Sequence, residues 1–150
     1  MRKLLSIFFV IVLFTNACTR KTNNAYLQAA NTAVENYSLA VESLDRSILE
    51  FQNDQTLLQD NTWTADMLQV LADLKTAGEA FKALPEPSSD LVNLDTLLAT
   101  TADQTTQYVD AMNTAINDKD IAAIDSARSL REDIGESFNE AQNELIRFLS

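Results

Sequence analysis

The segment ALPEPSSD, residues 83–90, contains both prolines of a chain of 150 residues. Proline has no backbone N–H and its ring collides with the preceding helical turn, so a helix must end here. Ser88 or Ser89 can cap a following helix, because a serine hydroxyl accepts a hydrogen bond from a free backbone N–H. The segment therefore predicts a turn between two helices.

Two further breaks are predicted from polar segments. QNDQTLLQDNT, residues 52–62, ends in residues that commonly cap helices. NDKD, residues 117–120, is typical of a tight turn, and we expect Asp118 to cap the helix that follows. The three breaks divide the chain beyond its N-terminal segment into four parts.

Each of the four parts carries apolar or small residues at steps of three or four. This spacing predicts an amphipathic helix with one buried face, and no part shows the period-two alternation of a half-buried strand. The stripes are Tyr26, Ala30, Ala33, Tyr37, Ala40, Leu44, Ile48 and Phe51; Trp63, Met67, Leu71, Leu74, Gly78 and Phe81; Leu91, Leu94, Leu98, Ala102, Thr105, Val109, Met112 and Ile116; and Ala127, Leu130, Ile134, Phe138, Ala141, Leu145 and Phe148.

The predicted helices are long and the breaks between them are short. Successive helices joined in this way run antiparallel, and they bury their stripes most economically against one another. We therefore predict an all-α fold, an antiparallel up-down-up-down four-helix bundle that follows an N-terminal signal peptide.

The signal peptide is predicted from the first residues of the chain. Arg2 and Lys3 precede the largely apolar run 4–14, and a small residue, Ala17, follows. Eleven helical residues span about 16 Å, which is well short of the roughly 30 Å hydrocarbon core of a bilayer. The pattern is typical of a secretory signal rather than a transmembrane helix.

Ala17 is followed directly by Cys18, the only cysteine of the chain. This pair resembles the lipobox of bacterial lipoproteins, although Thr15 and Asn16 depart from the leucine and small residue that the family prefers. The resemblance implies cleavage before Cys18, a diacylglyceryl group on its sulfur and acylation of the new amine. Thr19 resembles the residue found in lipoproteins sorted to an outer membrane, where the organism has one. A plain signal peptide cut elsewhere is one alternative, and an uncleaved anchor is another.

On this interpretation residues 1–17 are the signal peptide, residues 18–24 are the lipidated cysteine and a short polar tether, and residues 25–150 are the bundle. The mature chain keeps nine basic and 22 acidic side chains, a net charge of −13. Such a surface repels phosphates, so we expect no nucleic acid partner.

The chain contains no histidine. This excludes Ser-His-Asp and Cys-His catalysis, His-ligated haem, HExxH zinc sites and the Glu-x-x-His type of di-iron bundle. A lipidated Cys18 has no free thiol to act as a nucleophile. We therefore expect a protein that is not an enzyme and that has no cofactor, catalytic residue or metal site.

Two candidate sites remain. Ala102 and Thr105 make a thin layer in the third stripe, which leaves either a small-molecule pocket or a space filled by Tyr37, Phe81 or Phe138. On the fourth helix the glutamates recur every fourth residue and form either an interaction strip or a solvated face. These glutamates are Glu132, Glu136, Glu140 and Glu144.

The sequence thus predicts a lipid-anchored cell-envelope bundle on the extracytoplasmic side of a membrane. Its expected role is non-catalytic, either structural or in binding an envelope protein. The alternative is a lipoprotein that binds a small molecule or cation in the bundle interior or at an acidic patch. A cavity beside Ala102 and Thr105 would favour ligand binding, and a filled core with an exposed apolar strip would favour a protein partner.

Overall fold

The computed structural model describes the backbone of residues 2–150 and the side chains of residues 23–150. Across this backbone the chain is helical and contains no strand. The elements in order are α1 (Arg2–Asn53), the 3₁₀ helix η1 (Gln55–Gln59), α2 (Asn61–Lys82), the 3₁₀ helix η2 (Ser89–Leu91), α3 (Val92–Asn117), α4 (Ile121–Ser126) and α5 (Arg128–Leu149).

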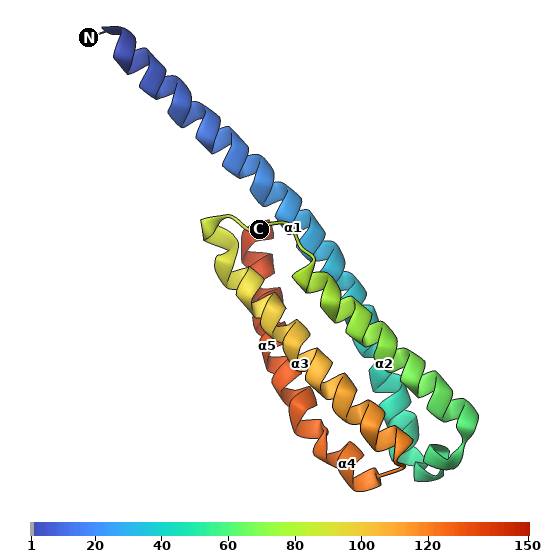
Figure 1. Cartoon of the computed structure of the whole chain (residues 1–150). Coiled ribbons are helices and arrows are strands. Elements are labelled where there is room, and N and C mark those ends of the chain that lie inside the picture. The colour runs from blue at the N-terminus through green and yellow to red at the C-terminus, as the bar shows by residue number, and fades with distance from the viewer. Residues whose placement is uncertain (1) are drawn as a thin grey trace.

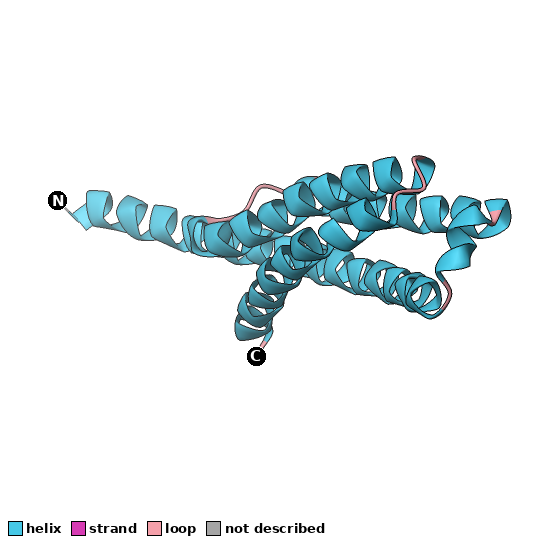
Figure 2. Cartoon of the chain, turned by 90° about the horizontal axis from the view of Figure 1, so that it is seen from below, coloured by secondary structure: helices cyan, strands magenta, loops and turns pink. Residues whose placement is uncertain are grey.

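The four long helices form the predicted antiparallel bundle (Figure 1). Close packing joins α1 to α2, α2 to α3 and α3 to α5, whereas α1 and α5 are the least closely packed of the neighbouring pairs. Figure 2 shows the C-terminal part of α5 diverging from the direction of the other long helices. The seam between α1 and α5 is therefore the most open side of the bundle.

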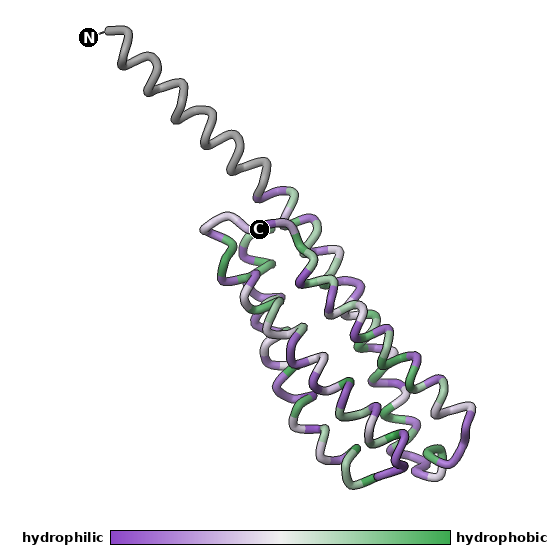
Figure 3. The backbone as a smooth tube through the Cα atoms, in the orientation of Figure 1, coloured by the Kyte–Doolittle hydropathy of each residue, from purple (hydrophilic) through white to green (hydrophobic). Residues whose placement is uncertain are grey.

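The predicted stripes form one continuous core. Every predicted position of the third stripe is buried, and so are Met67, Leu71, Leu74, Gly78 and Phe81 of the second. Along each helix of the bundle, hydrophobic and hydrophilic residues alternate every few positions (Figure 3). Burial of one face of each helix supplies the main driving force for this arrangement.

Aspartates begin two of the helices that follow breaks. The Asp60 carboxylate accepts hydrogen bonds from the Thr62 and Trp63 amides at 2.7 and 3.3 Å at the start of α2. Asp120 caps α4 by accepting from the Ala123 amide at 3.0 Å. The expectation that Asp118 caps this helix is wrong: Asp118 ends α3, and Lys119 follows with a φ of 54°, which reorients the chain before Asp120.

The structure differs from the sequence-based picture in two other places. The polar break 52–62 contains η1, whose Leu58 is buried in the core. The fourth predicted helix is divided into α4 and α5 at Ala127, where ψ is −11° instead of about −42°. Ala127 itself is buried, so the bend keeps the stripe on the core.

The predicted signal peptide (residues 1–17) and Cys18 lie outside the residues whose side chains are described. The sequence predicts that Asn23 and Asn24 belong to the polar tether, but they belong to α1. No proline or glycine separates them from the bundle, so nothing in the sequence ends the helix there. Among the described residues no helix has the length and apolar character needed to cross a membrane.

Candidate functional site

Ala102 and Thr105 lie fully inside the bundle, at the layer where the sequence predicts thin packing. The Tyr37 hydroxyl from α1 lies 2.6 Å from Thr105 Oγ1. Since Thr105 donates its own proton to the Thr101 carbonyl at 2.7 Å, Tyr37 is the donor in the pair. The polar atoms of this layer therefore satisfy one another.

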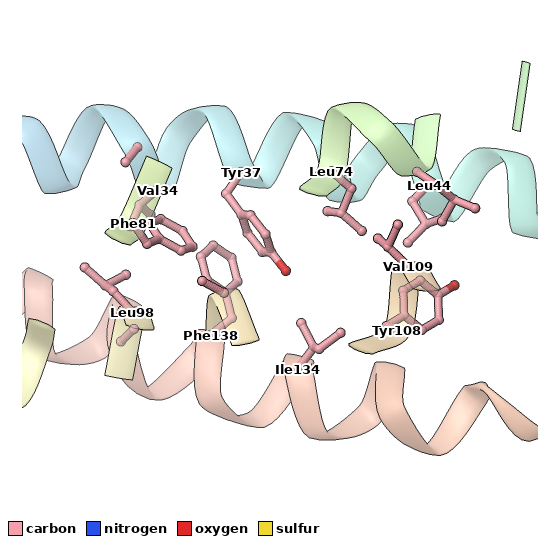
Figure 4. Close-up of a cluster of buried hydrophobic side chains, with 14 of the residues drawn as sticks. Val34, Tyr37, Leu44, Leu74, Phe81, Leu98, Tyr108, Val109, Ile134 and Phe138 are labelled. Atoms are coloured by element: carbon pink, nitrogen blue, oxygen red, sulfur yellow. The ribbon is translucent and has the colours of Figure 1, made fainter. Parts of the chain in front are cut away.

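Aromatic rings occupy the space around this pair. The Tyr37 ring centroid lies 5.0 Å from that of Phe81 and 4.7 Å from that of Phe138, and both pairs are tilted. Figure 4 shows the three rings side by side between α1 and α5. The aromatic residues that the sequence named as the alternative to a pocket thus converge beside Thr105.

A glycine explains how the helices approach closely at the thin layer. A Cβ added to Gly78 of α2 would lie 3.3 Å from Thr105 Cγ2 and 3.6 Å from Tyr37 Cε2. The small residues of α3 therefore face the one position of α2 that has no side chain. The layer is closed by approach of the helices, which removes the need for a ligand to fill it.

The predicted glutamate strip lies on α5. Glu132, Glu136 and Glu140 are exposed, whereas the Glu144 carboxylate is mostly covered and forms an ion pair with Arg147 one turn later. Among the described residues, no group of three or more acidic, cysteine or histidine side chains is placed to hold a metal ion.

A groove along the open α1/α5 seam is the candidate site that sequence reasoning missed. Its volume is about 240 Å³, and its apolar lining is Val34 of α1 with Leu145, Ile146 and Leu149 of α5. Ile146 and Leu149 are 61% and 52% exposed, so they place adjoining aliphatic surface at the groove.

The polar lining of this groove consists of amides: Asn31, Asn139, Gln142 and Asn143. Among the described side chains no charged residue lines it, although the chain as a whole carries a net charge of −11. Amides around exposed aliphatic side chains can pair with backbone or side-chain groups of a bound polypeptide. The lining of the groove is therefore uncharged in a chain whose composition is strongly acidic.

A signal for the groove was present in the sequence. Ile146 directly follows Leu145 of the fourth stripe and is rotated about 100° from it around the helix. Leu149 lies on the same side of the helix as Ile146. Apolar residues outside a core stripe indicate a second apolar face, which the stripe alone does not reveal.

No protein-family model, no curated protein and no solved structure matches this chain.

Proposed function

We propose that the protein is a lipid-anchored, non-catalytic bundle of the cell envelope that binds an envelope protein through the α1/α5 groove. Support for the anchor comes from the N-terminal sequence, in which a short apolar run leads to Ala17 and Cys18. Support for partner binding comes from the groove, and its charge-free, partly aliphatic lining is the observation that carries the proposal.

The chemistry of the groove favours an amphipathic helix as the bound element. An apolar stripe on that helix would cover Ile146 and Leu149, and uncharged polar residues beside the stripe would pair with the amides of the rim. The net negative charge of the chain disfavours an acidic partner, because like charges weaken association.

The groove also lies near the expected membrane surface. The C-terminus and the α2–α3 connection are at the end of the bundle where α1 enters it (Figure 1). Four residues lie between Cys18 and Asn23, so the distance from one to the other is five residue steps, which span at most about 18 Å. A partner that is itself held at the membrane would therefore lie close to the groove.

The anchor is tested by Cys18→Ala, which we expect to move the protein from the membrane fraction to the soluble fraction. Membrane association that is unchanged by this substitution would contradict lipid anchoring on Cys18. This test is independent of the groove, because Cys18 lies outside the described bundle.

The groove is tested by in-cell photo-crosslinking from position 146, with position 39 as the control. Leu39 is as exposed as Ile146, at 61%, but it does not line the α1/α5 groove. We expect one discrete protein adduct from position 146, none of the same mass from position 39, and loss of the adduct when Leu149 is replaced by Asp. The same adducts from both positions, or none from position 146, would contradict the proposal.

A further inference from the structure

A second pocket lies at the opposite end of the bundle, where α4 meets α5. It has a volume of about 100 Å³ and is formed by residues of α1, α3, α4 and α5. Its apolar lining comes from Ile48 and Phe51 of α1, Met112 of α3 and Ile124 of α4. These side chains are distant in the sequence, and the bend at Ala127 brings α4 over them.

One mostly buried tyrosine faces this pocket. Tyr108 of α3 is 3% exposed and lines the pocket, and its hydroxyl forms no hydrogen bond to a described residue and keeps contact with solvent. Figure 4 shows this hydroxyl pointing away from the cluster of Tyr37, Phe81 and Phe138. Burial raises the pKa of Tyr108 to about 12, so the phenol is a neutral donor at physiological pH. The hydroxyl is therefore free to donate to water or to a ligand that enters the pocket.

The rim of the pocket carries two positive and two negative side chains. Arg131 and Asp45 are already paired, with a nitrogen-to-oxygen distance of 2.7 Å. Arg128 and Asp125 also line the pocket and form no ion pair with any described residue. The pocket thus offers one available cation and one available anion, three residues apart on either side of Ala127.

We propose that this pocket binds a small zwitterion with an apolar side chain, of the class of the branched-chain α-amino acids. The ligand carboxylate pairs with Arg128, its ammonium group pairs with Asp125, and its side chain lies among the apolar residues of the pocket. The Tyr108 hydroxyl donates to a carboxylate oxygen.

The size of the pocket sets the size of the ligand side chain. An apolar cavity of about 150 Å³ holds one benzene molecule, so a pocket of about 100 Å³ holds roughly four carbon atoms. Leucine and isoleucine have side chains of this size. The charged groups of the ligand remain at the mouth, where the two rim residues are exposed.

The balanced rim charges distinguish a zwitterion from a simple ion. A plain carboxylate would leave Asp125 without a partner and would enter against the field of a chain with a net charge of −11. A plain amine would place its positive charge beside the positive charge of Arg128 and would leave Arg128 without an anionic partner. A ligand that carries both groups satisfies both side chains and adds no net charge.

The test is calorimetric titration of the full chain in a nonionic detergent with three ligands of matched shape. These are L-leucine, 4-methylpentanoate, which lacks the ammonium group, and 3-methylbutylamine, which lacks the carboxylate. We expect leucine to bind about tenfold more tightly than either single-charge analogue, because each lost pair contributes about 1.4 kcal/mol. Equal affinity for all three, or no saturable binding of leucine at millimolar concentration, would overturn the proposal.

Substitutions of Arg128 and Asp125 test separately the contact with the ligand carboxylate and the contact with the ligand ammonium group. Arg128→Gln should weaken leucine binding about tenfold and leave amine binding unchanged, whereas Asp125→Asn should weaken leucine and leave the carboxylate analogue unchanged. Arg147→Gln is the matched control, because Arg147 is on the same helix but does not line the pocket. Arg128 and Asp125 are exposed and form no ion pair with a described residue, so their variants should keep the parent melting temperature, whereas Arg147→Gln also removes the pair with Glu144 and should lower it slightly. An equal loss of leucine affinity in Arg128→Gln and Arg147→Gln would contradict the assignment.

Discussion

The hydrogen bond between Tyr37 and Thr105 should make these two residues thermodynamically coupled. Thr105→Val keeps a side chain of similar shape but leaves the buried Tyr37 hydroxyl without its acceptor. An unsatisfied buried donor costs about 1 to 3 kcal/mol, so we expect a loss of about 2 kcal/mol in the free energy of unfolding. Tyr37→Phe is expected to cost about 1 kcal/mol, because Thr105 keeps its bond to the Thr101 carbonyl.

The double variant should lose less stability than the sum of the two single variants. With both hydroxyls absent, no buried donor remains unpaired, and we expect a coupling energy of about 1 to 2 kcal/mol. The assay is urea unfolding of the purified full chain, followed by circular dichroism and analysed at a constant m-value. For a domain of this size, 1 kcal/mol corresponds to a shift in Tm of about 4 °C.

The control for this cycle is Thr101→Val. Thr101 is equally buried, but its hydroxyl donates to the Leu97 carbonyl of its own helix at 2.9 Å and does not contact Tyr37 through a hydrogen bond. Its effect should therefore add to that of Tyr37→Phe within about 0.5 kcal/mol. Additive effects for Tyr37 and Thr105 as well would refute the idea that this bond links α1 to α3.

Three other predictions test the core, the glutamate strip and the buried phenols. Leu98→Asp places an unpaired charge at a fully buried position and should abolish the cooperative melt seen by circular dichroism; a retained Tm would contradict the core assignment. Glu136 and Glu140 are exposed and one turn apart, so replacing both with Gln should change the free energy of unfolding by less than about 0.5 kcal/mol, measured by urea unfolding; a large loss would show that the strip is structural. Burial raises the pKa of Tyr108 from 10.0 to about 12, so its neutral form stabilises the fold below pH 10 and this contribution of about 2 to 3 kcal/mol is lost as the pH rises through 12. Burial also raises the pKa values of Tyr26 and Tyr37, so in a pH series of unfolding curves Tyr108→Phe should show a smaller alkaline loss than the parent chain, and an equal loss would contradict the assignment to Tyr108.

Most of the bundle could be predicted from local sequence because the signals are local. The spacing of Leu91, Leu94 and Leu98 reports the buried face of a helix without reference to any other helix. The two prolines near residue 86 end a helix through their own ring geometry. Residue type alone does not decide which aspartate caps the helix after residue 120, because Asp118 and Asp120 have the same side chain. Only the backbone turn at Lys119 selects Asp120 as the cap.

The candidate sites could be predicted only in part. Ala102 and Thr105 were correctly placed inside the bundle, but whether their layer is hollow depends on residues of other helices. Gly78, Tyr37 and Phe138 come from α2, α1 and α5, and their approach to Thr105 follows from helix packing. The groove beside Ile146 and the pocket beside Arg128 likewise combine residues more than 60 positions apart.

The sequence by itself therefore determined the helices, most of their boundaries, the face that each one buries and the expectation of a lipid anchor at Cys18. These features depend on residue type and spacing within a few turns of one segment. The tertiary structure alone decided that the thin layer closes, that the α1/α5 seam stays open and that the bend at Ala127 covers a second pocket. These features depend on the distances between helices, which are set by side chains meeting across the core and leave no periodic signal along the chain.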